Sequence, residues 1–110
     1  MRLINRGTIV IVPKKPYYDW SNALAPEVLI TEETTQEHNA YLVNESIIDV
    51  KKVVKKYYKD IFENELLEMW TDEADWPMNR TFKLFNEWFS YYVCAVTYDL
   101  GKDGITGIAL

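Results

Sequence analysis

The chain of 110 residues is poor in the residue types that build disulfide-linked or repetitive proteins. It contains one cysteine, one histidine, four glycines and four prolines. A single cysteine forms no internal disulfide, and it falls short of a zinc-binding cluster. The few glycines and prolines, beside 48% hydrophobic residues, exclude collagen-like and disordered chains. We therefore expect one folded domain with its own hydrophobic core.

Long hydrophobic runs are absent as well. The apolar block at residues 9–12 is shorter than the roughly 7–15 residues of a signal-peptide core. No run approaches the ~18 apolar residues of a membrane span. Cys94 lies inside an apolar run, which predicts a buried, unreactive thiol. Together these features predict a cytoplasmic protein without a membrane-spanning segment.

Positive charge is in the minority, because 12 lysines and arginines stand against 17 aspartates and glutamates, for a net charge of −5. This balance disfavours a general nucleic-acid binder, whose affinity comes from Lys and Arg releasing counterions from phosphates. The charges are also grouped by sign: residues 1–15 are purely basic and residues 19–49 purely acidic. Five lysines follow at 51–59, and residues 60–75 are acidic again. Such blocks can neutralise one another in the folded chain.

The spacing of apolar residues predicts an α+β fold, a small single-domain sandwich of about three strands and three helices. The β-branched run at 8–12 predicts a central strand. A long amphipathic helix is expected from near Ser46, with a bend or break near Asn64, where the apolar period slips. The expected order is β-α-β-α-α-β: strands at 8–12, 40–43 and 91–98, and helices at 17–24, from 46 onward and at 81–89. Residues 1–100 would form the domain, and 101–110 a glycine-containing tail or short hairpin.

Residues 70–81 combine two indoles, three carboxylates, an amide and a guanidinium in an expected loop. Loops on a rigid scaffold are where binding groups concentrate. Asp72, Glu73 and Asp75 can divide acid and base roles or hold a hard cation, and Arg80 offers a planar fork to an anion. The alternative is structural: Asp72 and Asp75 act as caps, and Asn79 or Thr81 caps the last helix. Arg80 would then pair with Glu73, and the tryptophans would cover the core.

A second candidate segment spans residues 13–20 and follows the end of the first expected strand. Tyr17, Trp20 and the neighbouring lysines suit protein recognition, where aromatic side chains dominate the binding energy. The alternative is that Tyr17 and Trp20 are core residues of a short helix.

Two further features, a run of lysines and the single histidine, indicate function more weakly. The lysines at 51–59 form one face of the long helix, which can contact an acidic partner or simply be solvated. His38 is the lone histidine, and without partner residues nearby in sequence it indicates neither catalysis nor metal binding.

Five short stretches together carry a resemblance to a known family. They are Pro-Lys-Lys-Pro-Tyr-Tyr-Asp-Trp at 13–20, Trp-Thr-Asp-Glu at 70–73, Trp-Pro at 76–77, Asn-Arg at 79–80 and Phe-Asn-Glu-Trp-Phe at 85–89. The chain resembles a family of small bacterial proteins that has no established activity, cofactor or partner. The resemblance implies a bacterial cytoplasmic single domain and brings no functional residue with it.

The leading hypothesis is a non-enzymatic binding or protein-interaction domain that uses no cofactor. In it, segment 17–20 and loop 70–80 form one aromatic-acidic surface, with Trp76 as the anchor and Arg80 orienting the loop or binding an anion. The partner would be another protein or a second copy of the chain. The candidate binding residues are Tyr17, Asp19, Trp20, Asp72, Glu73, Trp76 and Arg80.

Two alternatives remain open. One is a small carboxylate-based or metal-assisted hydrolase that uses the acids of loop 70–81, with Arg80 as a phosphate or oxyanion clamp and Asp19 or Tyr17 assisting. The other is nucleic-acid contact through the lysine face at 51–59, which the net negative charge disfavours.

Overall fold

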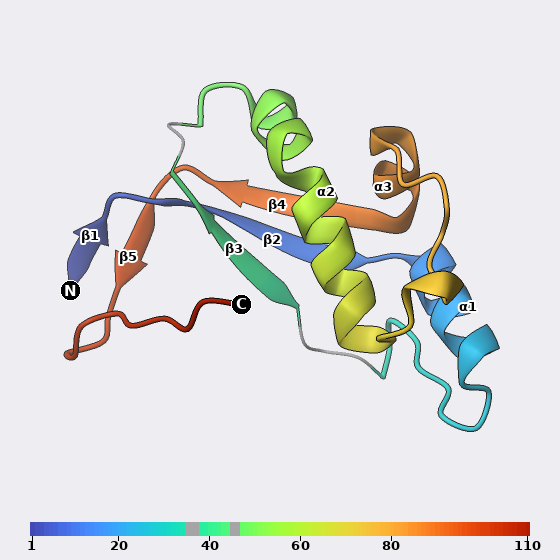
Figure 1. Cartoon of the computed structure of the whole chain (residues 1–110). Coiled ribbons are helices and arrows are strands. Elements are labelled where there is room, and N and C mark those ends of the chain that lie inside the picture. The colour runs from blue at the N-terminus through green and yellow to red at the C-terminus, as the bar shows by residue number, and fades with distance from the viewer. Residues whose placement is uncertain (35–37, 45–46) are drawn as a thin grey trace.

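The computed structural model describes residues 1–34, 38–44 and 47–110. In this part of the chain three helices, one short 3-10 turn and five strands are present (Figure 1). In chain order they are β1 (Arg2–Ile4), β2 (Gly7–Pro13), α1 (Lys15–Leu24), β3 (Asn39–Val43), α2 (Val50–Met69), η1 (Glu73–Asp75), α3 (Phe82–Trp88), β4 (Phe89–Cys94) and β5 (Thr97–Asp99). The expected α+β class is confirmed, and the order of the main elements is close to the expected one.

The main sheet has three antiparallel strands in the order β3-β2-β4, so β2 is central as its β-branched run predicted. Ile9 and Ile11 of β2 are completely buried and point toward the helices. Because side chains alternate along a strand, their neighbours Val10 and Val12 point to the opposite face.

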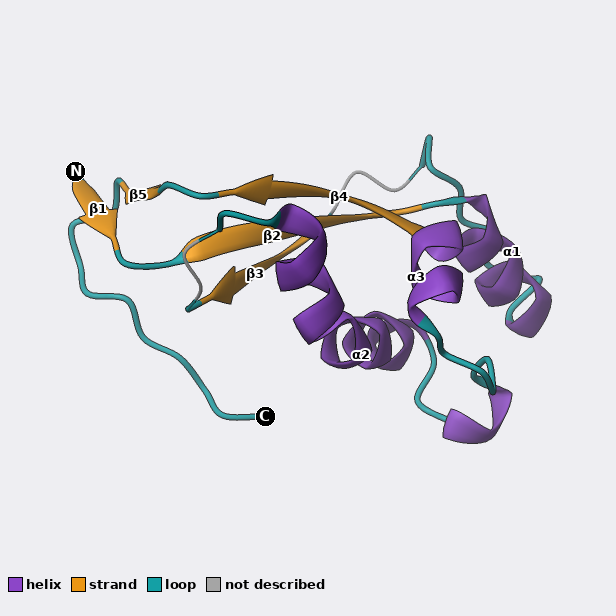
Figure 2. Ribbon diagram, turned by 90° about the horizontal axis from the view of Figure 1, so that it is seen from above, coloured by secondary structure: helices purple, strands orange, loops and turns teal. Residues whose placement is uncertain are grey.

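Helix α1 lies beyond the end of β2, and α2 and α3 lie on the same side of this sheet (Figure 2). The core therefore forms in a single layer between them and the sheet, and aromatic rings fill much of it. Phe62 of α2, for example, contacts the rings of Phe85, Trp88 and Phe89 at centroid distances of 5.4–5.8 Å. The buried apolar residues are Ile9, Ile11, Tyr17, Tyr18, Val43, Val53, Val54, Ile61, Phe62, Leu66, Trp76, Phe85 and Phe89.

Helix α2 is one continuous helix of 20 residues, so the expected bend near Asn64 is wrong. The apolar period slips there because a polar residue, Glu65, occupies a buried position of the helix. The helix begins later than expected, with Asp49 as its N-cap accepting a hydrogen bond from the backbone N–H of Lys52 at 3.2 Å. Ser46, the expected start, lies outside the described residues.

A two-stranded antiparallel ribbon of β1 and β5 projects from one end of the main sheet (Figure 1). The expected strand at 91–98 is therefore divided, since β4 ends at Cys94 and β5 pairs with the N-terminus instead of with β2. Thr8 and Thr97 join the two sheets through a hydroxyl–hydroxyl hydrogen bond of 2.7 Å. Residues 100–110 form no hairpin and make an irregular, exposed tail.

Among the described residues, no helix is both long and apolar enough to cross a membrane.

Candidate functional site

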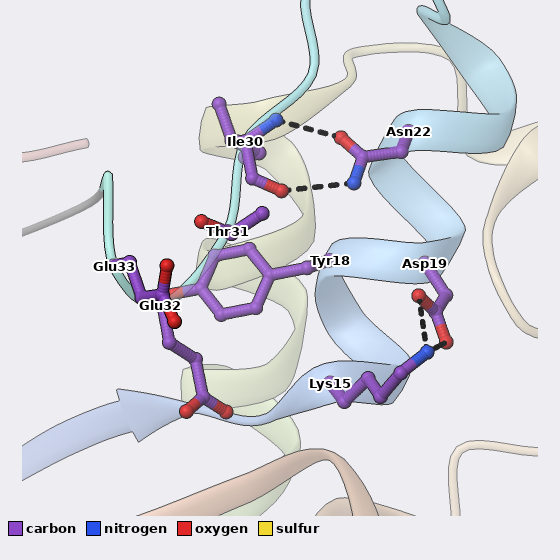
Figure 3. A pocket seen from close by; sticks show the side chains of 8 residues that line it. All are labelled: Lys15, Tyr18, Asp19, Asn22, Ile30, Thr31, Glu32 and Glu33. Carbon is purple, nitrogen blue, oxygen red and sulfur yellow. Dashed lines mark hydrogen bonds and ion pairs between the residues drawn. The ribbon is translucent and has the colours of Figure 1, made fainter.

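A surface pocket with a volume of about 310 Å³ lies between α1 and the segment after it (Figure 3). The ring of Tyr18, which is itself buried, extends from α1 toward Glu32 and Glu33 on the opposite wall. We refer to it as the acidic pocket. Its lining residues are Lys15, Tyr18, Asp19, Asn22, Ile30, Thr31, Glu32 and Glu33.

Asn22 holds the two walls of the acidic pocket together. Its amide N–H donates to the Ile30 carbonyl at 2.8 Å, and its side-chain oxygen accepts from the Ile30 N–H at 2.9 Å (Figure 3). The turn that follows is closed by Thr31 and Thr34, since the Thr31 N–H donates to the Thr34 hydroxyl at 2.9 Å. The pocket wall is therefore built by side-chain hydrogen bonds rather than by a regular element.

The charge of the acidic pocket is negative. Lys15 forms an i,i+4 ion pair with Asp19 at 2.8 Å, which neutralises one carboxylate. Glu32 and Glu33 are exposed on the facing segment and give the pocket its net charge. The pocket thus offers two exposed carboxylates, which suit a cationic group, beside a lining that includes the buried Tyr18 ring.

The structure brings the two sequence-predicted segments together, although largely through structural contacts. The indole N–H of Trp20 donates to the backbone carbonyl of Asp75 at 2.9 Å, so α1 packs beside the η1 loop. The Asp75 carboxylate accepts from the indole N–H of Trp70 at 2.9 Å. Asp72 caps η1 by accepting from the Ala74 N–H at 3.0 Å, and it is exposed like Glu73.

Trp76 was expected to anchor a partner, yet it is only 7% exposed and belongs to the core. Its indole N–H donates to the Trp70 carbonyl at 2.8 Å. Arg80 lies over the Trp76 ring at 5.6 Å and donates to the Pro77 carbonyl at 2.8 Å. Arg80 pairs with Glu63 at 3.7 Å instead of with Glu73. A variant at Trp76 would therefore disturb the fold, and the binding roles of the seven candidate residues stay predictions.

Tyr17 is a buried residue that links α1 to α2, because its hydroxyl donates to the backbone carbonyl of Glu65 at 2.8 Å. Asp19, by contrast, is exposed at the edge of the acidic pocket. Of the candidates in segment 17–20, the structure therefore places Asp19 in the pocket, Tyr17 in the core and Trp20 against the η1 loop.

A polar network between β3 and α2 was missed by the sequence reasoning. The Glu65 carboxylate, in a residue only 4% exposed, accepts from the Tyr41 hydroxyl at 2.5 Å and from the Asn39 amide at 2.6 Å. The same Asn39 amide also donates to Glu68 at 2.6 Å, while Asn64 donates to the Tyr41 hydroxyl at 2.9 Å. One feature of the sequence could have indicated this network: Glu65 lies four residues after Ile61, on the buried face of the helix.

Burial sets the proton affinities in this network. It raises the pKa of Glu65 above its ordinary value, against the hydrogen bonds from Asn39 and Tyr41, which lower it. The pKa values of Tyr17 and Tyr41 are also raised, again mainly by burial. The phenol groups thus act as neutral hydrogen-bond donors.

The remaining candidates lie on the surface. The expected buried position of Cys94 is wrong, because its thiol lies at the exposed end of β4. The β4 side chains on that face of the sheet have no helix above them, so an apolar sequence context did not imply burial. His38 is exposed, as are the five lysines at 51–59. Within the described ranges, no group of three or more His, Cys, Asp or Glu residues is placed to hold a metal ion.

Comparisons with protein-family models, with curated proteins and with solved structures found no match for this chain.

Proposed function

We propose that the protein is a non-catalytic binding domain that recognises a basic segment of a partner protein at the acidic pocket. The observation that carries the proposal is the pair of exposed carboxylates, on Glu32 and Glu33, in the wall of one preformed pocket of about 310 Å³ whose lining also includes the apolar groups of Tyr18 and Ile30. A lysine or arginine side chain combines an apolar stem with a cationic head and matches both parts.

The neighbouring surface supports the same partner. The exposed carboxylates of Asp72 and Glu73 lie on the η1 loop, which Trp20 joins to α1. A basic peptide that enters the pocket can therefore continue toward further negative charge. Complementary charge of this kind raises the association rate and favours basic over acidic partners. The proposal also assigns the protein to the cytoplasm, where the exposed Cys94 thiol stays reduced.

Titration with hexalysine and with hexaglutamate, followed by backbone NMR of the labelled protein, tests this function. Hexalysine is expected to shift the resonances of residues 15–22 and 30–34, and hexaglutamate to leave them unchanged. Because exposed charge pairs contribute up to about 1 kcal/mol each, the double variant Glu32→Gln, Glu33→Gln should bind hexalysine about fivefold to tenfold more weakly.

The matched control is Glu87→Gln with Asp103→Asn, which removes the same charge from exposed positions outside the pocket. The control should bind like the parent protein at equal ionic strength. Equal weakening of both double variants would show that hexalysine responds to net charge alone, and it would contradict the assignment to the acidic pocket.

A further inference from the structure

The face of the main sheet that points away from the helices has an unusual composition. Its side chains alternate with the buried Ile9 and Ile11, and cross-strand register assigns the others to the same face. We call this surface the open face. It consists of Val10, Val12, Ala40, Leu42, Ser90, Tyr92 and Cys94, and it ends at Thr8, which is buried and hydrogen-bonded to Thr97 of β5.

None of the open-face residues is charged, although charged residues make up 26% of the chain. An antiparallel sheet with one face in water normally shows alternation of apolar and polar residues. Here the outward positions of β2 are valines, and Leu42 and Tyr92 are 51% and 69% exposed. The open face is therefore composed like the inner face of a β-sandwich, where a second sheet packs against the first.

The register of the sheet makes this face self-complementary in shape. Ala40, Val10 and Tyr92 form one row across the three strands, with the small residue on β3 and the large one on β4. In the next row the order of sizes reverses, because Leu42 lies on β3 and Cys94 on β4, with Thr8 between them.

We infer that the open face binds the open face of a second copy of this chain around a two-fold axis parallel to β2. Such an axis, running above Val10, places β4 of each copy over β3 of the other. Tyr92 then faces the second copy's Ala40, and Leu42 faces its Cys94. Each large side chain meets a small one, and no charge loses its water in the contact.

The twist of the two sheets preserves the central contact. Packed sheets rotate by about 30° relative to one another. Tyr92 and Ala40 lie one strand spacing, about 4.8 Å, from the axis, so this rotation displaces them by only about 2.5 Å.

The area of the open face determines how stable the dimer is expected to be. Three strands of five to seven residues cover roughly 14 by 20 Å. That is less than the ~800 Å² per partner of a standard interface, so a weak dimer is expected.

Sedimentation velocity of the full chain, from about 10 µM to about 1 mM, tests the inference. The expected result is a shift from the 13.0 kDa monomer to twice that mass. Over the same range Cys94 should react more slowly with a thiol reagent, since dimerisation covers it. A monomer at all concentrations, or unchanged thiol reactivity in a dimer, would overturn the proposal.

Leu42→Lys places a charge on the open face and should weaken the dimer at least about tenfold, because the charge would have to be buried. Leu67→Lys is the matched control, since Leu67 is 48% exposed and lies on α2. It should leave the dimer unchanged. Equal dimerisation of both variants would place the contact elsewhere.

A size exchange tests the two-fold pairing itself. Ala40→Tyr puts two large rings opposite each other and should abolish the dimer. Adding Tyr92→Ala restores one large and one small residue in each contact, and dimerisation should return. A double variant that stays monomeric while its circular dichroism matches the parent would refute this arrangement.

Glu32→Gln with Glu33→Gln should not affect the dimer, which separates this inference from the proposed function.

Discussion

At the scale of single residues, Glu65 is the most unusual group in the structure. A carboxylate at a buried helix position loses hydration, and two donors, the Tyr41 hydroxyl and the Asn39 amide, replace part of it. Glu68, the tyrosine hydroxyls and His38 are the titratable groups that act on Glu65 or share its network. Burial outweighs the donors, so the pKa of Glu65 lies above its ordinary value of 4.5.

This raised pKa predicts how stability depends on pH. Between the unfolded and the folded pKa, the folded state holds a proton that the unfolded state has released, so the free energy of unfolding falls as pH rises. Glu65→Gln removes that titration and keeps an oxygen that accepts from Tyr41. The variant should therefore gain stability relative to the parent as pH rises from 4 toward 7, by about 1.4 kcal/mol for each unit of pKa shift.

Urea unfolding of both proteins at several pH values measures the difference. Asp60→Asn is the control, because Asp60 is an exposed acid on the same helix. A pH-dependent gain of the same size in Asp60→Asn would show that the effect follows net charge and not the burial of Glu65. A parent protein that gains stability over the Gln variant as pH rises would contradict the account of Glu65.

At the scale of elements, the tryptophans of the η1 loop fix the conformation of the loop and do not serve as its binding residues. Trp76 packs in the core and closes the loop through its indole bond to the Trp70 carbonyl. Trp76→Ala should lower the free energy of unfolding by about 3 kcal/mol, because it leaves a cavity and an unpaired carbonyl. Trp76→Phe retains most of the packing and should cost only about 1–2 kcal/mol. Urea unfolding distinguishes the two, and equal small losses would show that Trp76 is not a core residue.

The elements differ in how far the sequence could predict them. The β-branched run predicted β2, and the long apolar stripe predicted α2, although the expected start of α2 and its expected bend near Asn64 were wrong. Strands β1 and β5 have three residues each, which is too short for a period, and their pairing joins residues 2–4 to 97–99. The acidic pocket was missed because Asn22 reaches Ile30 through side-chain bonds that leave no pattern in the sequence.

At the scale of the whole molecule, the chain is more extended than its length requires. The radius of gyration is 15.4 Å, whereas about 13 Å is typical of a chain of this length. The β1–β5 ribbon, which projects from one end of the main sheet (Figure 1), and the exposed tail at 101–110 contribute to the difference. Leu110 lines the rim of a cavity of about 280 Å³ between β3 and α2, but its own side chain is fully exposed.

This geometry predicts that the tail contributes little to folding. Every residue from 101 to 110 is exposed, so deleting them removes almost no buried apolar area. The midpoint of thermal unfolding, measured by circular dichroism, should change by less than about 2 °C. Deleting residues 96–110 should cost more, because it also removes β5, the Thr97 partner of Thr8 and the Asp99 partner of Arg2. If the shorter deletion already lowers the midpoint by as much as the longer one, the tail packs into the β3–α2 cavity in solution and is part of the folded unit.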